Sequence, residues 1–161
     1  MPRRCSFPTM EHPEHAHQAF PPELLKRIAH NIADVEEATG TDIRISIRDL
    51  REAGEADLSV KDLAEKEFAM LGMNHDDGYG ILLLILYHER KFYVCGDAGV
   101  HSKVHPETWK DVASTLGAHF AKADYEGGLR EALKKIEHHL NGKLKKHASA
   151  EKRTSDEVMV R

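Results

Sequence analysis

The feature that most constrains this chain is a run of six consecutive aliphatic residues, "ILLLIL", at positions 81–86. Glycines at positions 78 and 80 precede the run, and a short polar stretch follows it. A buried helix segment can have a similar composition, but this run is short and glycines bound it. A short segment that is apolar on both faces is typical of a strand covered by helices on each side. We therefore predict a central strand over residues 81–86.

The residues after this run predict that the chain turns back on itself. "YHER" (residues 87–90) reads as a short polar turn, and "KFYVCG" (residues 91–96) has the composition of a returning strand. The two strands would form an antiparallel hairpin in which Gly80 faces Asp97. The expected function depends on this register.

Apolar residues recur at helical spacing in four further segments, which begin at Pro21, Ser59, Pro106 and Asp124. Trp109 lies on the apolar face of the third helix and is expected in the core. "TDIRISIRDL" (residues 41–50) alternates between apolar and polar side chains and predicts a strand near a sheet edge. The element order α-β-α-β-β-α-α predicts an α/β fold. We expect a three-layer α/β/α sandwich with a small mixed sheet, made of a parallel, right-handed crossover and a central β-hairpin.

The chain divides into three parts by composition. Residues 1–19 are rich in Pro and His without periodicity and are predicted to be a flexible arm. Residues 20–141 would form one α/β/α domain, since a chain of 161 residues suits a single core. Residues 142–161 are charged and non-periodic and are predicted to be a disordered tail.

Charge and hydropathy exclude several classes of partner. The net charge of -4 and the pI of about 6.3 produce no field that would attract nucleic acid. The apolar runs are far shorter than the roughly 20 residues of a membrane span. The start of the chain has no apolar region of a secretory signal, which favours a cytoplasmic protein. Of the two cysteines, Cys5 and Cys95, the second lies in a predicted strand and is expected to be a buried thiol.

The predicted hairpin brings acidic residues together. At ~3.3 Å per residue and ~5 Å between strands, Asp76, Asp77 and Asp97 can share a volume roughly 10 Å across. Such carboxylates would repel one another unless a cation lies between them. Carboxylates and backbone carbonyls are hard oxygen ligands, which select Ca²⁺ or Mg²⁺. The alternative is simple turn chemistry, because Asp and Gly are common in turns.

Two groups of histidines are weaker candidates for metal ligands. His12, His15 and His17 lie close together in the predicted arm and could bind Ni²⁺, Cu²⁺ or Zn²⁺ weakly. The alternative is a solvated arm with incidental histidines. His101 and His105 follow the predicted hairpin and could add nitrogen ligands to the cation, although solvent-facing loop residues are the favoured interpretation.

Several strings of the sequence resemble those of the TPM domain family, whose members include thylakoid-lumen and bacterial proteins. They are "FPPELLKRIAHNIADVEEATGTDIRISI", "LAEKEFAMLGM", "KFYVCGDAGVHSKV" with a following Trp, and "FAKADYEGGLREAL". The similarity spans about residues 20–140. The chain resembles the soluble branch of the family that has no signal sequence, where Lys91-Phe92, Gly96-Asp97, Gly99-Val100 and Lys103-Val104 occupy matching places.

The resemblance implies an α/β/α sandwich that binds divalent cations at the loops around one sheet end. The family's loop positions correspond to Asp77 and Asp97. The chain departs from the family pattern at "GYG" (residues 78–80), which separates the acidic turn from the strand, and at Asp42, where the branch often has Glu. Acid phosphatase activity has been attributed to plant members, whereas other members act in assembly or maintenance without a convincing catalytic apparatus.

Two functions are compatible with these features. The favoured one is a binding module that holds Ca²⁺ or Mg²⁺ in its acidic loops and presents a surface to a protein partner. The alternative is a metal-assisted acid phosphatase. It is disfavoured because Arg90 and Lys91 would lie at the opposite end of the hairpin, which leaves Lys103 as the nearby cation for a phosphate. Asp77 could be proposed as base or nucleophile, but the sequence assigns no catalytic residue.

Overall fold

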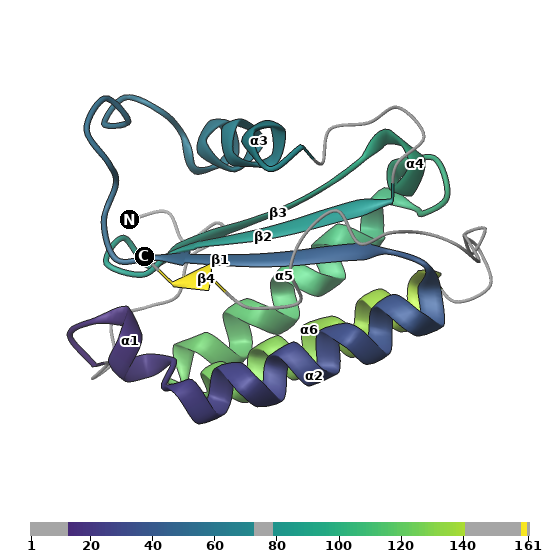
Figure 1. Ribbon diagram of the computed structural model, residues 1–161, viewed down its shortest axis with the longest axis horizontal. Helices are drawn as coiled ribbons and strands as arrows, with labels where there is room; N and C mark the ends of the chain where they lie inside the picture. The colour runs from purple at the N-terminus through teal and green to yellow at the C-terminus, as the bar shows by residue number, and fades with distance from the viewer. Residues whose placement is uncertain (1–12, 73–78, 141–158, 161) are drawn as a thin grey trace.

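The computed structural model describes residues 13–72, 79–140 and 159–160 (Figure 1). Its elements follow the chain in this order: α1 (Ala16–Ala19), α2 (Pro22–Thr39), β1 (Asp42–Arg48), α3 (Val60–Met70), β2 (Gly80–Leu86), β3 (Lys91–Gly96), α4 (Ala98–His101), α5 (Pro106–Ala121), α6 (Tyr125–Leu140) and β4 (Met159–Val160). The strands form one sheet in the order β3-β2-β1-β4.

The sheet is mixed. β1 and β2 are parallel, with Asp42 opposite Gly80. β2 and β3 are antiparallel, with Leu86 opposite Lys91. The turn between them contains Arg90 at a positive φ of 57°. The predicted parallel connection, the central hairpin and its register are confirmed.

Helices cover both faces of the sheet, as predicted for a three-layer sandwich. α3 lies on one face, and α2, α5 and α6 lie on the other (Figure 1). Alternate residues of β2 enter the two cores: Ile81, Leu83 and Ile85 belong to the larger core, and Leu82, Leu84 and Leu86 pack with α3. All seven residues of β2 are buried. This two-sided burial explains why "ILLLIL" shows no alternation.

The helix boundaries follow from local capping groups. The Ser59 hydroxyl accepts a hydrogen bond from the Asp62 N–H at 3.0 Å and begins α3. Gly40 ends α2 in the left-handed conformation, with φ of 81°, which an L side chain rarely adopts. The predicted starts of these two helices, at Pro21 and Ser59, are confirmed.

The described part of the predicted arm is folded onto the domain. Ala16 and Ala19 are buried, and the Tyr87 hydroxyl donates to the Pro13 carbonyl at 2.5 Å. The Asp49 carboxylate accepts from the Ala16 N–H at 2.6 Å. Residues 13–19 therefore depart from the flexible arm predicted for residues 1–19, because contacts with distant residues order a segment that has no periodicity of its own.

Two further features differ from the sequence-based picture. In the segment predicted as a disordered tail, Met159 and Val160 pair in parallel with Ser46 and Ile47 of β1. Trp109 is only half-buried, and its indole N–H donates to His101 Nδ1 at 3.3 Å. Trp109 thus packs against the core, as predicted, but at its margin, where its polar N–H finds a partner.

A buried ion-pair network holds the end of β1 to α3. The Arg48 side chain is 4% exposed, and its Nη1 donates to Glu55 Oε1 at 2.8 Å. Its Nη2 donates to Glu67 Oε1 at 2.5 Å. A buried charge is tolerated when it is paired and hydrogen-bonded, so each member of this network depends on the others.

The first prediction concerns this network. Glu67→Ala should lower the free energy of unfolding by about 3–5 kcal/mol, because it removes a partner from the buried Arg48 guanidinium. Urea denaturation measures this change. Glu65→Ala is the matched control, since Glu65 is exposed on the same helix and should cost at most about 0.5 kcal/mol. Equal losses in the two variants would contradict the assignment.

Candidate functional site

Asp97 closes the open end of the hairpin. Its N–H donates to the Gly80 carbonyl at 2.9 Å, and its Oδ2 accepts from the Gly80 N–H at 2.9 Å. The residue is 1% exposed. Gly80 therefore faces Asp97, as the sequence predicts, and a buried carboxylate lies at the point where β2 begins.

The other two predicted ligands, Asp76 and Asp77, lie outside the described residues. Their approach to Asp97 thus stays a prediction. The covalent chain limits the distance: Gly80 is three positions after Asp77, and three residue steps span at most roughly 11 Å. Gly80 is itself hydrogen-bonded to Asp97, so this limit on the distance from Gly80 is measured from a residue next to Asp97.

A further acidic residue lies at the same end of the sheet. Asp42 is opposite Gly80 in the parallel register, and its N–H donates to the Tyr79 carbonyl at 3.0 Å. Asp42, Gly80 and Asp97 thus form a row across β1, β2 and β3. The sequence singled out Asp42 only as a departure from the family pattern. The predicted parallel pairing could have located Asp42 at this sheet end, because it aligns the starts of β1 and β2.

The two histidines that follow Asp97 make local hydrogen bonds. His101 Nδ1 accepts from the Trp109 indole N–H at 3.3 Å, and His105 Nδ1 accepts from the Glu107 N–H at 3.1 Å. A ring nitrogen that accepts a hydrogen bond uses its lone pair, which is the electron pair that a metal would need. These bonds support the favoured interpretation of both residues as loop and helix-cap residues.

A cavity of about 600 Å³ runs along β3 and reaches Gly96, the residue before Asp97. The residues from Asp97 to the end of α4 are called the Asp97 loop below. β3 is the outer strand of the described sheet. Residues of α3 and α5 line the cavity together with those of β3. Its lining includes the apolar side chains of Phe68, Phe92 and Val94, with Gly96 and Trp109 at the end that adjoins Asp97. A surface that is partly apolar, with Lys61, Glu65 and Lys110 also in its lining, therefore adjoins Asp97.

Cys95 also lines this cavity, and its burial favours the protonated form of the thiol. Burial raises its pKa to about 12, and the charges of Glu65, Glu67 and Asp97 act in the same direction. The thiol lies 3.9 Å from the Ala64 carbonyl, to which it donates. The prediction of a buried thiol is confirmed.

Arg90 and Lys91 lie far from Asp97, whereas Lys61 and Lys110 line the cavity beside it. Lys91 pairs with Leu86 at the far end of the hairpin, and Arg90 lies over the Tyr87 ring at 5.3 Å from its centroid. Lys103 is exposed in the turn after α4. The expected positions of Arg90 and Lys91 are confirmed, and neither can clamp a phosphate bound near Asp97.

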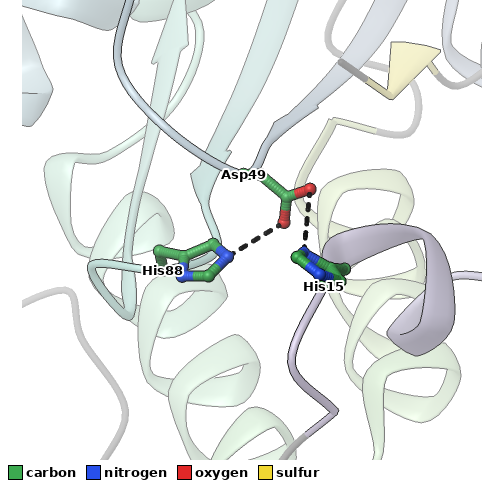
Figure 2. Close-up of side chains that lie close together, drawn as sticks. All are labelled: His15, Asp49 and His88. Atoms are coloured by element: carbon green, nitrogen blue, oxygen red, sulfur yellow. Dashed lines mark ion pairs between the residues drawn. The ribbon is translucent and has the colours of Figure 1, made fainter.

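A second cluster of polar side chains lies at the opposite end of the sheet. His15, Asp49 and His88 come from three separate segments and point toward one another (Figure 2). One ligand atom from each residue lies within 4.8 Å of the other two. The sequence placed His15 with other histidines of the arm. It gave no signal for Asp49 or His88, because their approach depends on where residues 13–19 pack.

The fold and the acidic sheet end define a class: a small α/β/α domain with carboxylates around the start of its central hairpin. The TPM domain model matches residues 15–139, and the chain belongs to the TPM domain family. The family assignment made from the sequence is thus confirmed. No curated protein matches the chain significantly. Among the described residues, no helix has the length and apolar character needed to cross a membrane.

The solved structures that share the fold include three bacterial proteins. The BA42 protein from the psychrophilic bacterium Bizionia argentinensis matches with a TM-score of 0.74 and 21% identity, over 86% of this chain and 93% of that one. The N-terminal domain of a P. gingivalis protein matches with a TM-score of 0.66 and 15% identity, over 84% of this chain and 85% of that one. The N-terminal domain of the cg2496 protein from Corynebacterium glutamicum matches with a TM-score of 0.60 and 9% identity, over 81% of this chain and 82% of that one.

The second prediction concerns the structural part played by Asp97. Asp97→Ala should lower the free energy of unfolding by about 1–3 kcal/mol, because it leaves the buried Gly80 N–H without its side-chain acceptor. Hydrogen exchange at the Gly80 amide should accelerate. Asp97→Asn keeps an oxygen acceptor and should cost less. Equal exchange rates at Gly80 in the wild type and Asp97→Ala would contradict this role.

Proposed function

We propose that this TPM domain is a binding module that holds Ca²⁺ or Mg²⁺ through Asp77, Asp97 and Asp76 and presents the metal-bound loops to a protein partner. The observation that carries the proposal is the double pairing of Asp97 with Gly80. It joins the end of β3 to the start of β2, which directly follows the acidic loop in the chain.

The donor chemistry at this sheet end suits a hard cation. Asp97 offers a buried carboxylate, and Asp42 adds a second acidic residue two strands away. Oxygen donors of this kind prefer Ca²⁺ and Mg²⁺ over thiophilic metals. A cation there would also offset the repulsion among neighbouring carboxylates. Family membership supports the same assignment, since the resemblance implies cation binding at these loops.

The surroundings favour binding over catalysis. The side chains of Arg90 and Lys91 lie at the far end of the hairpin and cannot hold a phosphate at this site. The cavity beside the Asp97 loop has apolar walls at Phe68, Phe92 and Val94. A partner that contacts both the loop and this cavity would combine apolar burial with a contact that depends on the cation.

The third prediction tests the cation site. In an NMR titration with Ca²⁺ or Mg²⁺, the amides of Gly80, Asp97 and α4 should shift at up to millimolar ion. Asp77→Asn and Asp97→Asn should each weaken binding by about tenfold or more, because both remove a negative charge from the ligand set. Asn is chosen over Ala at position 97 because its oxygen can still accept from the Gly80 N–H.

Asp57→Asn is the control for this titration. Asp57 is exposed in the connection after β1, at the other end of the sheet, and its removal should leave the affinity unchanged. Bound ion at one hundred times the Kd should also raise the free energy of unfolding by about 2.7 kcal/mol, and the melting temperature should rise with it. A folded sample whose spectrum ignores both ions would refute the proposal. Turnover of an aryl phosphate that Asp97→Asn abolishes would instead favour a metal-assisted phosphomonoesterase.

A further inference from the structure

We propose that His15, Asp49 and His88 form a second metal site, for a borderline transition-metal ion such as Zn²⁺. This site is independent of the proposed calcium or magnesium site. Asp49 directly follows β1, and one residue separates His88 from the end of β2. Asp97, in contrast, pairs with Gly80 at the start of β2. β2 has seven residues, so the two sites are separated by roughly 20 Å.

The three side chains converge on one small volume (Figure 2). His88 Nε2 lies 3.5 Å from Asp49 Oδ1, and His15 Nδ1 lies 4.0 Å from Asp49 Oδ2. Ligands bound to a tetrahedral Zn²⁺ at about 2.0–2.1 Å lie roughly 3.3 Å from one another. Small rotations of the two rings would therefore bring all three ligands into bonding distance of one ion.

The spacing is better suited to an ion than to direct hydrogen bonds. Normal N–H···O hydrogen bonds have heavy-atom distances of about 2.7–3.2 Å, and both imidazole–carboxylate distances are longer. Holding the start of α1 explains the contact of Asp49 with the Ala16 N–H. That role does not explain why two imidazoles from other segments face the same carboxylate.

Backbone hydrogen bonds hold the ligand-bearing segments in place. The Asp49 carboxylate accepts from the Ala16 N–H at 2.6 Å, which fixes it next to His15. The Asp49 carbonyl accepts from the His88 N–H at 3.2 Å. The His15 N–H donates to Gln18 Oε1 at 3.0 Å, at the start of α1. A site whose ligands are positioned before the ion arrives loses less entropy on binding.

The ligand set and its exposure indicate the kind of metal. Two imidazoles and one carboxylate are the ligands that Zn²⁺, Ni²⁺ and Cu²⁺ accept, and Ca²⁺ prefers oxygen alone. The side chains of His15, Asp49 and His88 are 45%, 28% and 35% exposed, so an ion can enter from solvent. The fourth position of the ion would be open to water, as in sites with three protein ligands.

A metal at this position would act as a clip. It would join the segment that contains α1 to the end of β1 and to the hairpin turn, which are far apart in the sequence (Figure 2). Ions that bind the folded state and close long loops stabilise it. The ion would therefore control how firmly residues 13–19 pack on the domain.

The test is calorimetric titration of the full chain with Zn²⁺, followed by Co²⁺ absorption spectroscopy to report the ligand geometry. The wild type should bind one Zn²⁺ at this site. His15→Ala, Asp49→Asn and His88→Ala should each lower the affinity by about tenfold or more, since loss of a residue that merely supports a ligand already costs about 10–100-fold. Asp49→Asn retains an oxygen that can accept from the Ala16 N–H.

Two controls separate this site from incidental histidine binding. His30→Ala removes an exposed histidine of α2 and should bind Zn²⁺ as the wild type does. The double variant His12→Ala/His17→Ala should also retain binding. His88→Gln replaces His88→Ala if circular dichroism shows that the latter is unfolded. In each ligand variant, the Ca²⁺ titration should match the wild type, which distinguishes failure here from failure of the proposed function.

Three outcomes would overturn the proposal. They are no Zn²⁺ binding by the wild type, unchanged affinity in His88→Ala and Asp49→Asn, and loss of binding in the His12→Ala/His17→Ala variant alone. The last would assign the metal to the histidine-rich segment by itself.

Discussion

The burial of β2 on both faces is the constraint on which the rest of the structure depends. Its six aliphatic residues from Ile81 to Leu86 alternate between two cores, and each contributes about 1.5–3 kcal/mol when fully buried. The strand cannot shift by one residue without exchanging every side chain between those cores. Both polar clusters are attached to its ends: Asp97 pairs with Gly80 at the start, and His88 contacts Asp49 beyond the end. A fixed register therefore positions both.

Alternation along β1 gives the far end of the sheet two different polar environments. The Arg48 side chain enters the α3 layer, where Glu55 and Glu67 neutralise it in a buried network. Asp49, the next residue, faces residues 13–19 and the hairpin turn instead. Successive side chains of an extended chain point to opposite faces, so neighbouring residues serve different layers. A structural charge network and a candidate metal site can thus adjoin without sharing a ligand.

The sequence predicts those parts of the fold that local pattern determines. β2 follows from its apolar run, the hairpin register from the short polar turn, and α2 and α3 from their capping residues. Asp97 follows from that register. The packing of α1, the pairing of β4 and the approach of His15 to Asp49 and His88 are not predictable in this way, since contacts between distant segments decide them. Trp109 shows a third limit. Helical spacing places it beside core residues, but the outer strand β3 leaves its indole at the margin.

The two ends of the sheet differ in donor chemistry, and this difference bears on how one small domain could hold two kinds of ion. The start of β2 lies beside the acidic residues Asp42 and Asp97, and oxygen ligands of this kind favour hard cations. The end of β2 adjoins two imidazoles and one carboxylate, which favour borderline transition metals. An ion suited to one end is therefore poorly suited to the other. Because β2 is fully buried and paired on both sides, it separates the two ends as a rigid spacer. Ion binding at one end should accordingly change the loops at that end and leave the other unaltered.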